Sequence, residues 1–122
     1  MKTVLIDCSI PFIQFPVNTY NARLPLGLMY IQAYLKKMGI MDVAIDLLWE
    51  KGARTILEQI KKTKPTIVGL SFFTETRIHA LDLARQIKDL FPRVVIVAGG
   101  IHASAMTKQI IESYDYIDYV IK

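Results

Sequence analysis

The chain has 122 residues, with 15 Lys and Arg against 11 Asp and Glu, which gives a formal net charge of +4. Hydrophobic residues make up 52% of it and charged residues 21%, a balance that is typical of a packed globular domain and excludes disordered and collagen-like chains. The single cysteine excludes an intrachain disulfide and a thiolate-ligated zinc or iron–sulfur site, and it indicates a reducing compartment.

Predicted strands and helices alternate along the chain. Apolar runs rich in β-branched residues predict strands over residues 3–7, 43–47, 66–72, 94–98 and 118–121. Apolar residues at helical spacing predict helices over residues 28–38, 53–60, 74–91 and 103–114. Thr74 is expected to cap the third helix, and residues 8–24 are expected to form a long irregular loop. The alternation predicts an α/β domain: a flavodoxin-like or Rossmann-like parallel sheet of five strands in the order 2-1-3-4-5, with helices on both faces.

A ligand of such a sheet binds beyond the carboxyl ends of the strands, where the strand order reverses. That rule selects residues 7–24, 71–75 and 99–104. The turn after the first strand lacks the glycines of a dinucleotide site, and Ser71 stands where a phosphate-accepting receiver domain needs Asp. No Lys follows a glycine-rich turn, so a P-loop is excluded as well.

Adjacent glycines follow the fourth predicted strand. Gly99 and Gly100 remove two β-carbons in succession, which would let a planar or chain-like ligand lie against the backbone. The alternative is a turn that needs a positive φ. At the end of the third predicted strand, Ser71 and Thr74 offer hydroxyl groups to the same cleft.

Four segments resemble a known family. They are Leu24-Pro-Leu-Gly-Leu-Met-Tyr-Ile31, Pro65-Thr-Ile-Val-Gly-Leu-Ser71, Ala98-Gly-Gly-Ile-His-Ala-Ser104 and Asp118-Tyr-Val-Ile-Lys122. In this order they are similar to the cobalamin-binding domain at the N-terminus of cobalamin-dependent radical SAM enzymes of the methyltransferase type. The resemblance implies a cobalamin whose benzimidazole tail enters the core beside Ser71 and the glycine pair. The cofactor-binding residues that it implies are Leu24, Ser71, Phe72, Thr74, Glu75, Gly99, Gly100 and His102.

The chain departs from one family pattern. In related domains a D-x-H-x-x-G loop supplies a histidine to cobalt, and counting back from Gly27 places Ala22 and Leu24 at the Asp and His positions. The resemblance then implies cobalt without a protein histidine, an arrangement that favours methyl transfer to weak nucleophiles or radicals. His102 would bind a phosphate or ribose of the nucleotide tail; a capping or packing histidine is the alternative.

Other polar groups near the predicted strand ends carry weaker hypotheses. Cys8 could be a nucleophile, but a small buried thiol is the favoured interpretation. Asp7 and Asp46 could form an acidic pair, although carboxylates at strand ends commonly cap the next loop. Tyr30 and Tyr34, like Tyr20, could flank a corrin ring or simply pack. We assign no catalytic residue and no metal ligand.

The last predicted strand and the residues around it indicate which partners to expect. Four helices over five strands leave one side of the last strand bare, so residues 116–121 are expected to mediate self-association. We expect one cobalamin-binding-like domain over residues 1–122, truncated from a longer radical SAM protein. An iron–sulfur cluster and S-adenosylmethionine would belong to a downstream catalytic barrel, because this chain holds no C-x-x-x-C-x-x-C motif. A cofactor-free docking scaffold and a free-standing cobalamin sensor are the alternatives.

The remaining expectations concern location. Every apolar run is shorter than the about 18 residues of a membrane span. The lysines and arginines are spread over predicted helix faces without interleaved aromatics. We therefore expect a soluble, cytoplasmic protein with no membrane or nucleic-acid partner.

Overall fold

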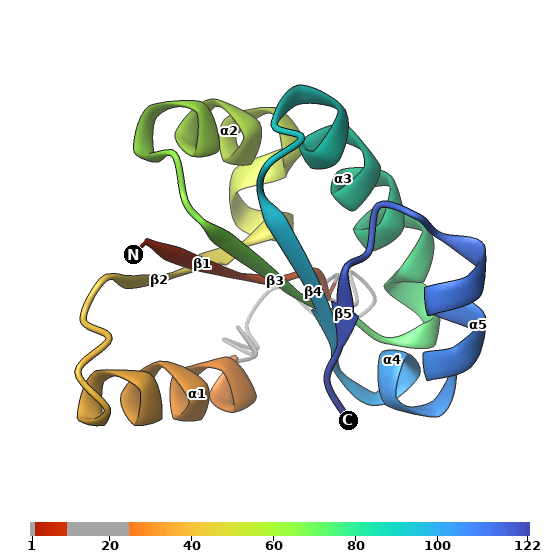
Figure 1. Ribbon diagram of the computed structural model, residues 1–122, viewed down its shortest axis with the longest axis horizontal. Helices are drawn as coiled ribbons and strands as arrows, with labels where there is room; N and C mark the ends of the chain where they lie inside the picture. Colours follow the sequence, from red (N-terminus) through yellow and green to blue (C-terminus); the bar gives the residue numbers. More distant parts are fainter. Residues whose placement is uncertain (1, 10–24) are drawn as a thin grey trace, which may run out of the picture.

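The computed structural model describes residues 2–9 and 25–122. These residues form one parallel sheet in the order β2-β1-β3-β4-β5, which confirms the predicted class and strand order (Figure 1). The strands are β1 (Thr3–Asp7), β2 (Val43–Leu47), β3 (Ile67–Ser71), β4 (Val95–Gly99) and β5 (Tyr119–Val120). The helices are α1 (Leu26–Lys37), α2 (Leu48–Thr63), the 3-10 turn η1 (Thr74–Thr76), α3 (Arg77–Leu90), α4 (Ile101–Ala105) and α5 (Thr107–Ser113).

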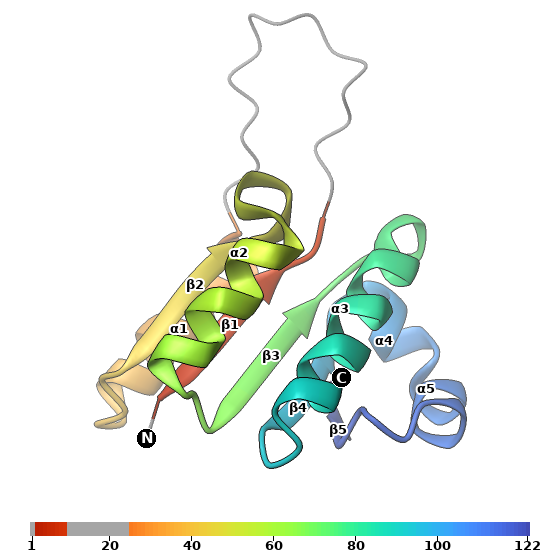
Figure 2. The same cartoon turned by 90° about the horizontal axis from the view of Figure 1, so that it is seen from above.

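The strand order decides which face each helix covers. The chain steps from β1 to β2 in one direction and from β2 through β5 in the other. Because crossovers between parallel strands are right-handed, α1 lies on one face and the later helices lie on the opposite face. In Figure 1, α1 lies below β1 and β2 at the lower left, with α2 and α3 above the sheet; Figure 2 shows α2 and α3 crossing the same face. One face is therefore well covered, and the other is covered by α1 over β1 and β2.

Two apolar cores follow from this arrangement. The larger core packs α2 to α5 onto the sheet around fully buried side chains such as Ile6, Ile60 and Ile96. The smaller core joins α1 to the sheet through Leu28 and its neighbours on β1 and β2. Burying one such side chain contributes about 1.5–3 kcal/mol, so the small core holds α1 less firmly than the large core holds the other helices.

Two helix boundaries differ from the prediction. α2 begins at Leu48, about one turn before the predicted start. Gly52, with φ +79° and ψ 156°, leaves helical geometry and separates this first turn from the predicted segment that follows it. The predicted fourth helix is two helices, α4 and α5, which meet at Met106. There the Thr107 hydroxyl donates to the carbonyl groups of Ala103 and Ser104, and such bonds compete with a regular helical ladder.

The last strand is short and half bare. Its preceding residue Asp118 accepts hydrogen bonds from the Ile96 amide and from Lys88 of α3, which ties β5 to the sheet. Tyr119 and Ile121 are 62% and 58% exposed, as expected for a strand without a helix on one side. Among the described helices, none is both long and apolar enough to cross a membrane.

Candidate functional site

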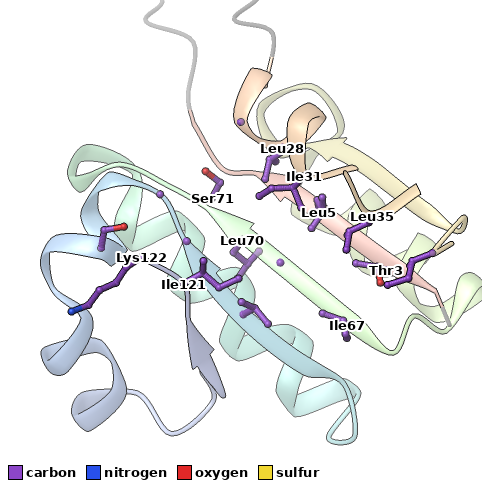
Figure 3. Close-up of a pocket in the computed structure, with 17 residues that line it drawn as sticks. Thr3, Leu5, Leu28, Ile31, Leu35, Ile67, Leu70, Ser71, Ile121 and Lys122 are labelled. Atoms are coloured by element: carbon purple, nitrogen blue, oxygen red, sulfur yellow. The ribbon is translucent and has the colours of Figure 1, made fainter. Parts of the chain in front are cut away.

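The half of the sheet face that α1 leaves open is an apolar groove of about 480 Å³ (Figure 3). Its floor is formed by β1, β3 and β4, one wall by α1, and the other side by the end of the chain. The lining residues are Thr3, Leu5, Gly27, Leu28, Ile31, Leu35, Ile40, Ile67, Gly69, Leu70, Ser71, Val97, Gly99, Gly100, Ser104, Ile121 and Lys122. The volume lies within the about 300–1,000 Å³ that is usual for small-molecule sites.

The groove follows from the two-residue period of the strands. Alternate residues of a strand share a face, so Ile67, Gly69 and Ser71 all contribute to the floor from β3. Gly69 lies beside Leu5 of β1, and a β-carbon at Gly69 would approach the Leu5 Cδ2 atom to 2.9 Å. Glycine at this position keeps the floor flat. The aliphatic side chains of Leu28 and Ile31 form the α1 wall.

Of the adjacent glycines, one makes space for a ligand and the other is needed for a turn with positive φ. Gly100 has φ +99°, and a β-carbon there would lie 2.8 Å from the Phe72 carbonyl oxygen, so it is the turn glycine. A β-carbon at Gly99 would have no atom within 4 Å and would project into open space. Gly99 therefore leaves room for a ligand, and Gly100 lets the β4 loop approach the backbone of β3.

Hydroxyl groups mark the carboxyl end of the groove. Ser71 ends β3, and Ser104 lies in the first turn of α4, where its amide donates to the Gly100 carbonyl. Within the described part of the chain, no hydrogen bond engages either side-chain oxygen. These oxygens can donate to or accept from a ligand at the mouth of an otherwise apolar groove.

Other candidate residues lie beside the groove rather than in it. The Phe72 ring is 1% exposed and belongs to the large core on the opposite face. Thr74 does not cap α3, contrary to the prediction: it begins η1, and its hydroxyl lies 2.9 Å from the Nδ1 atom of His102. The His102 ring packs against Phe72 with centroids 5.8 Å apart. Glu75 is exposed on η1. Leu24 lies outside the described residues.

Asp7 and Asp46 do not pair with each other, and Cys8 is not placed as a nucleophile. The Asp7 carboxylate accepts a hydrogen bond from the Ser9 amide, whereas Asp46 pairs with Lys51 of α2 at 2.6 Å. Burial raises the pKa of the Cys8 thiol well above its ordinary value, with a further contribution from Asp7, so Cys8 is the inert buried thiol favoured above. Across residues 2–9 and 25–122, His, Cys, Asp and Glu side chains form no cluster able to hold a metal ion.

The tyrosines of α1 belong neither to the core nor to the groove. Tyr30 and Tyr34 are 76% and 62% exposed on the outer surface of the helix. The prediction that they either pack or flank a ligand therefore finds no support in their contacts, because neither lines the groove.

Sequence reasoning missed most of the groove. It examined the strand ends and overlooked the side chains in the middle of the strands, such as Leu5, Gly69 and Val97. The signal was present: these residues alternate with core residues, and in the described part of the chain the strand order leaves α1 as the helix that covers their face. Ser104 was within a chosen segment but was not selected.

Comparison with known proteins identifies the domain. Residues 18–122 match the family model of the B12-binding domain. The chain belongs to the B12-binding domain family. Over 100 residues it is 30% identical to the anaerobic magnesium-protoporphyrin IX monomethyl ester cyclase of Rubrivivax gelatinosus, and 28% identical to the enzyme of the same name from Cereibacter sphaeroides. The aligned part is 80% of this chain but 18% and 16% of those enzymes.

The residues of this B12-binding domain fit the nucleotide tail of the cofactor. The tail ends in a flat, apolar benzimidazole ring, and the groove offers a flat apolar floor beside Gly69 and Gly99. The ring nitrogen that is not bonded to the ribose accepts a hydrogen bond once it leaves cobalt. Ser71 and Ser104, whose hydroxyl groups have no partner among the described residues, offer donors at the carboxyl end.

Proposed function

We propose that this B12-binding domain holds cobalamin with the benzimidazole tail in the α1 groove and the corrin ring at the carboxyl edge of the sheet. The observation that carries the proposal is the open space above Gly99 in a groove of about 480 Å³ with an apolar lining. Apolar surface left open to water is unfavourable, and exposed apolar grooves commonly mark ligand or partner sites. A ligand that fills the groove gives it a function.

The second part of the proposal is that no histidine of this chain reaches cobalt. Leu24 stands where the family pattern has histidine, and the chain has two histidines in all. His79 is exposed on α3, on the covered side of the sheet, and the Nδ1 atom of His102 is engaged by Thr74. When bound, cobalamin supplies a cobalt atom that can carry a methyl group or exchange electrons. The chain's part is to bind the tail and leave the lower face of the corrin without a nitrogen ligand.

The reaction is proposed from relatedness. The resemblance to cobalamin-dependent radical SAM enzymes supports methyl transfer, with the iron–sulfur cluster and S-adenosylmethionine in a downstream catalytic barrel. The two relatives carry the name of a cyclase, which favours ring closure on a tetrapyrrole as the second candidate. Both candidates give this domain the same role, the presentation of cobalamin to another domain.

Binding of hydroxocobalamin tests the proposal. We expect the purified chain to bind it with the benzimidazole displaced from cobalt, and to show no nitrogen hyperfine splitting in the electron paramagnetic resonance spectrum after reduction to cobalt(II). Nitrogen splitting would contradict the ligation part. Absence of binding would favour the cofactor-free scaffold. A free-standing sensor would bind cobalamin equally well, but no catalytic domain would follow in the same polypeptide.

A further inference from the structure

Two loops that follow the adjacent strands β3 and β4 meet at the carboxyl end of the sheet. The β3 loop contributes Phe72 and Thr74, and the β4 loop contributes Gly100 and His102. The backbones are in close contact, because a β-carbon at Gly100 would meet the Phe72 carbonyl at 2.8 Å and the Phe72 nitrogen at 3.1 Å. The Phe72 amide donates to the Gly99 carbonyl at 3.4 Å.

Side chains reinforce this approach. The Thr74 hydroxyl lies 2.9 Å from the His102 Nδ1 atom, and the two residues are 28 positions apart in sequence. The His102 ring lies against the fully buried Phe72 ring at 5.8 Å, tilted by 43°. In the described residues the Thr74 side chain has no other hydrogen-bond partner. The pair therefore connects η1 to the first turn of α4.

We infer that His102 is a positioning residue, which through its hydrogen bond to Thr74 fixes the Gly99–Gly100 turn at the groove mouth. This inference rests on the proposed function, and it replaces the expectation that His102 contacts the nucleotide itself. The groove lining includes Gly99, Gly100 and Ser104 but not His102. α4 has five residues, and a helix this short is only weakly stabilised by its own backbone hydrogen bonds. A hydrogen bond from its second residue, His102, to Thr74 of η1 therefore restrains the Gly99–Gly100 turn that precedes α4.

Substitutions at the pair separate the hydrogen bond from packing. Thr74→Val removes the hydroxyl at constant shape, and Thr74→Ser keeps it. His102→Phe keeps a ring against Phe72 and removes Nδ1. His79→Phe is the matched control, because His79 is exposed on α3 and outside the groove lining.

The test measures hydroxocobalamin affinity by visible absorption, with circular dichroism and thermal unfolding to show that each variant is folded. We expect Thr74→Val and His102→Phe each to weaken binding about 3- to 10-fold, the effect of losing one hydrogen bond. The double variant should be no weaker than the single ones, since one bond is lost in all three. Thr74→Ser and His79→Phe should bind as the unmodified chain does.

The outcomes distinguish this inference from the proposed function. If the unmodified chain does not bind hydroxocobalamin, the proposed function fails and the positioning role fails with it. If it binds and His102→Phe binds equally well, His102 has no positioning role while the groove assignment stands. Additive losses in the double variant would show that Thr74 and His102 act separately, which also overturns the inference. Failure of Thr74→Ser to restore affinity would assign the effect to packing.

Discussion

Gly99→Val should weaken binding of the cobalamin tail about 5- to 150-fold while leaving the fold intact. Gly99 ends β4 without a positive φ, and a β-carbon there would have no neighbour within 4 Å. A β-branched residue at a strand position is tolerated, and it stabilises by up to about 1 kcal/mol relative to glycine. In the complex, the same side chain would occupy the space of the ligand. Overpacking of this kind costs about 1–3 kcal/mol, which corresponds to binding that is about 5- to 150-fold weaker.

Gly100 gives the contrasting outcome. A side chain at Gly100 must adopt φ +99° and meet the Phe72 carbonyl at 2.8 Å, so Gly100→Ala should destabilise the fold by about 1–3 kcal/mol. Ala44→Val, on an exposed position of β2 outside the groove, controls for the effect of a bulkier strand residue. The assay is hydroxocobalamin titration beside chemical unfolding. If Gly99→Val binds like the unmodified chain, the tail does not lie in this groove.

Two further outcomes concern β5. Burial tends to raise the pKa of Asp118, but the hydrogen bonds from Ile96 and Lys88 outweigh it and hold that pKa below its ordinary value of 3.8. A carboxyl group with a lowered pKa stabilises the fold above pH 3.8 and loses that effect as the pH falls further. Asp118→Asn should therefore reduce the free energy of unfolding by about 1 kcal/mol at neutral pH, and urea titrations should show the difference vanishing in acid. For the exposed edge near Tyr119 and Ile121, light scattering should show self-association that Tyr119→Lys reduces; a strictly monomeric chain at high concentration would refute it.

The fold was predictable because its main signals are local. Each strand of this sheet lies in a short, mainly apolar stretch of the sequence, and helical periodicity places the helices between them. The helix boundaries that differ lie where one residue interrupts a helix. Gly52, with φ +79°, breaks α2 one turn after its start, and the Thr107 hydroxyl donates to two carbonyl groups of the preceding turn, where α4 gives way to α5.

The candidate site was predictable only at its mouth. Ser71, Gly99 and Gly100 stand at strand ends, where topology alone directs attention, and all three line the groove. Phe72 and Glu75 are neighbours of those residues in sequence but do not line the groove, because alternation turns the Phe72 ring to the other face and η1 exposes Glu75. The pairing of Thr74 with His102 depends on how two loops meet, which no periodicity encodes.

The direction of the groove argues for the kind of ligand. It runs along the sheet from Ile67 to Ser71, four residue steps or about 13 Å, instead of across the carboxyl edge. A cofactor lying flat over the edge would use only Ser71, Gly99 and Ser104, and would leave the apolar floor around Leu5 in contact with water. A ligand with a long apolar tail and a larger polar body would cover the apolar floor with its tail and contact the hydroxyl groups at the carboxyl edge with its body. Among the described residues the strand order accounts for this shape, because the step from β1 back to β2 places α1 on this face and the later helices on the other, which leaves the floor beside β1 without a covering helix.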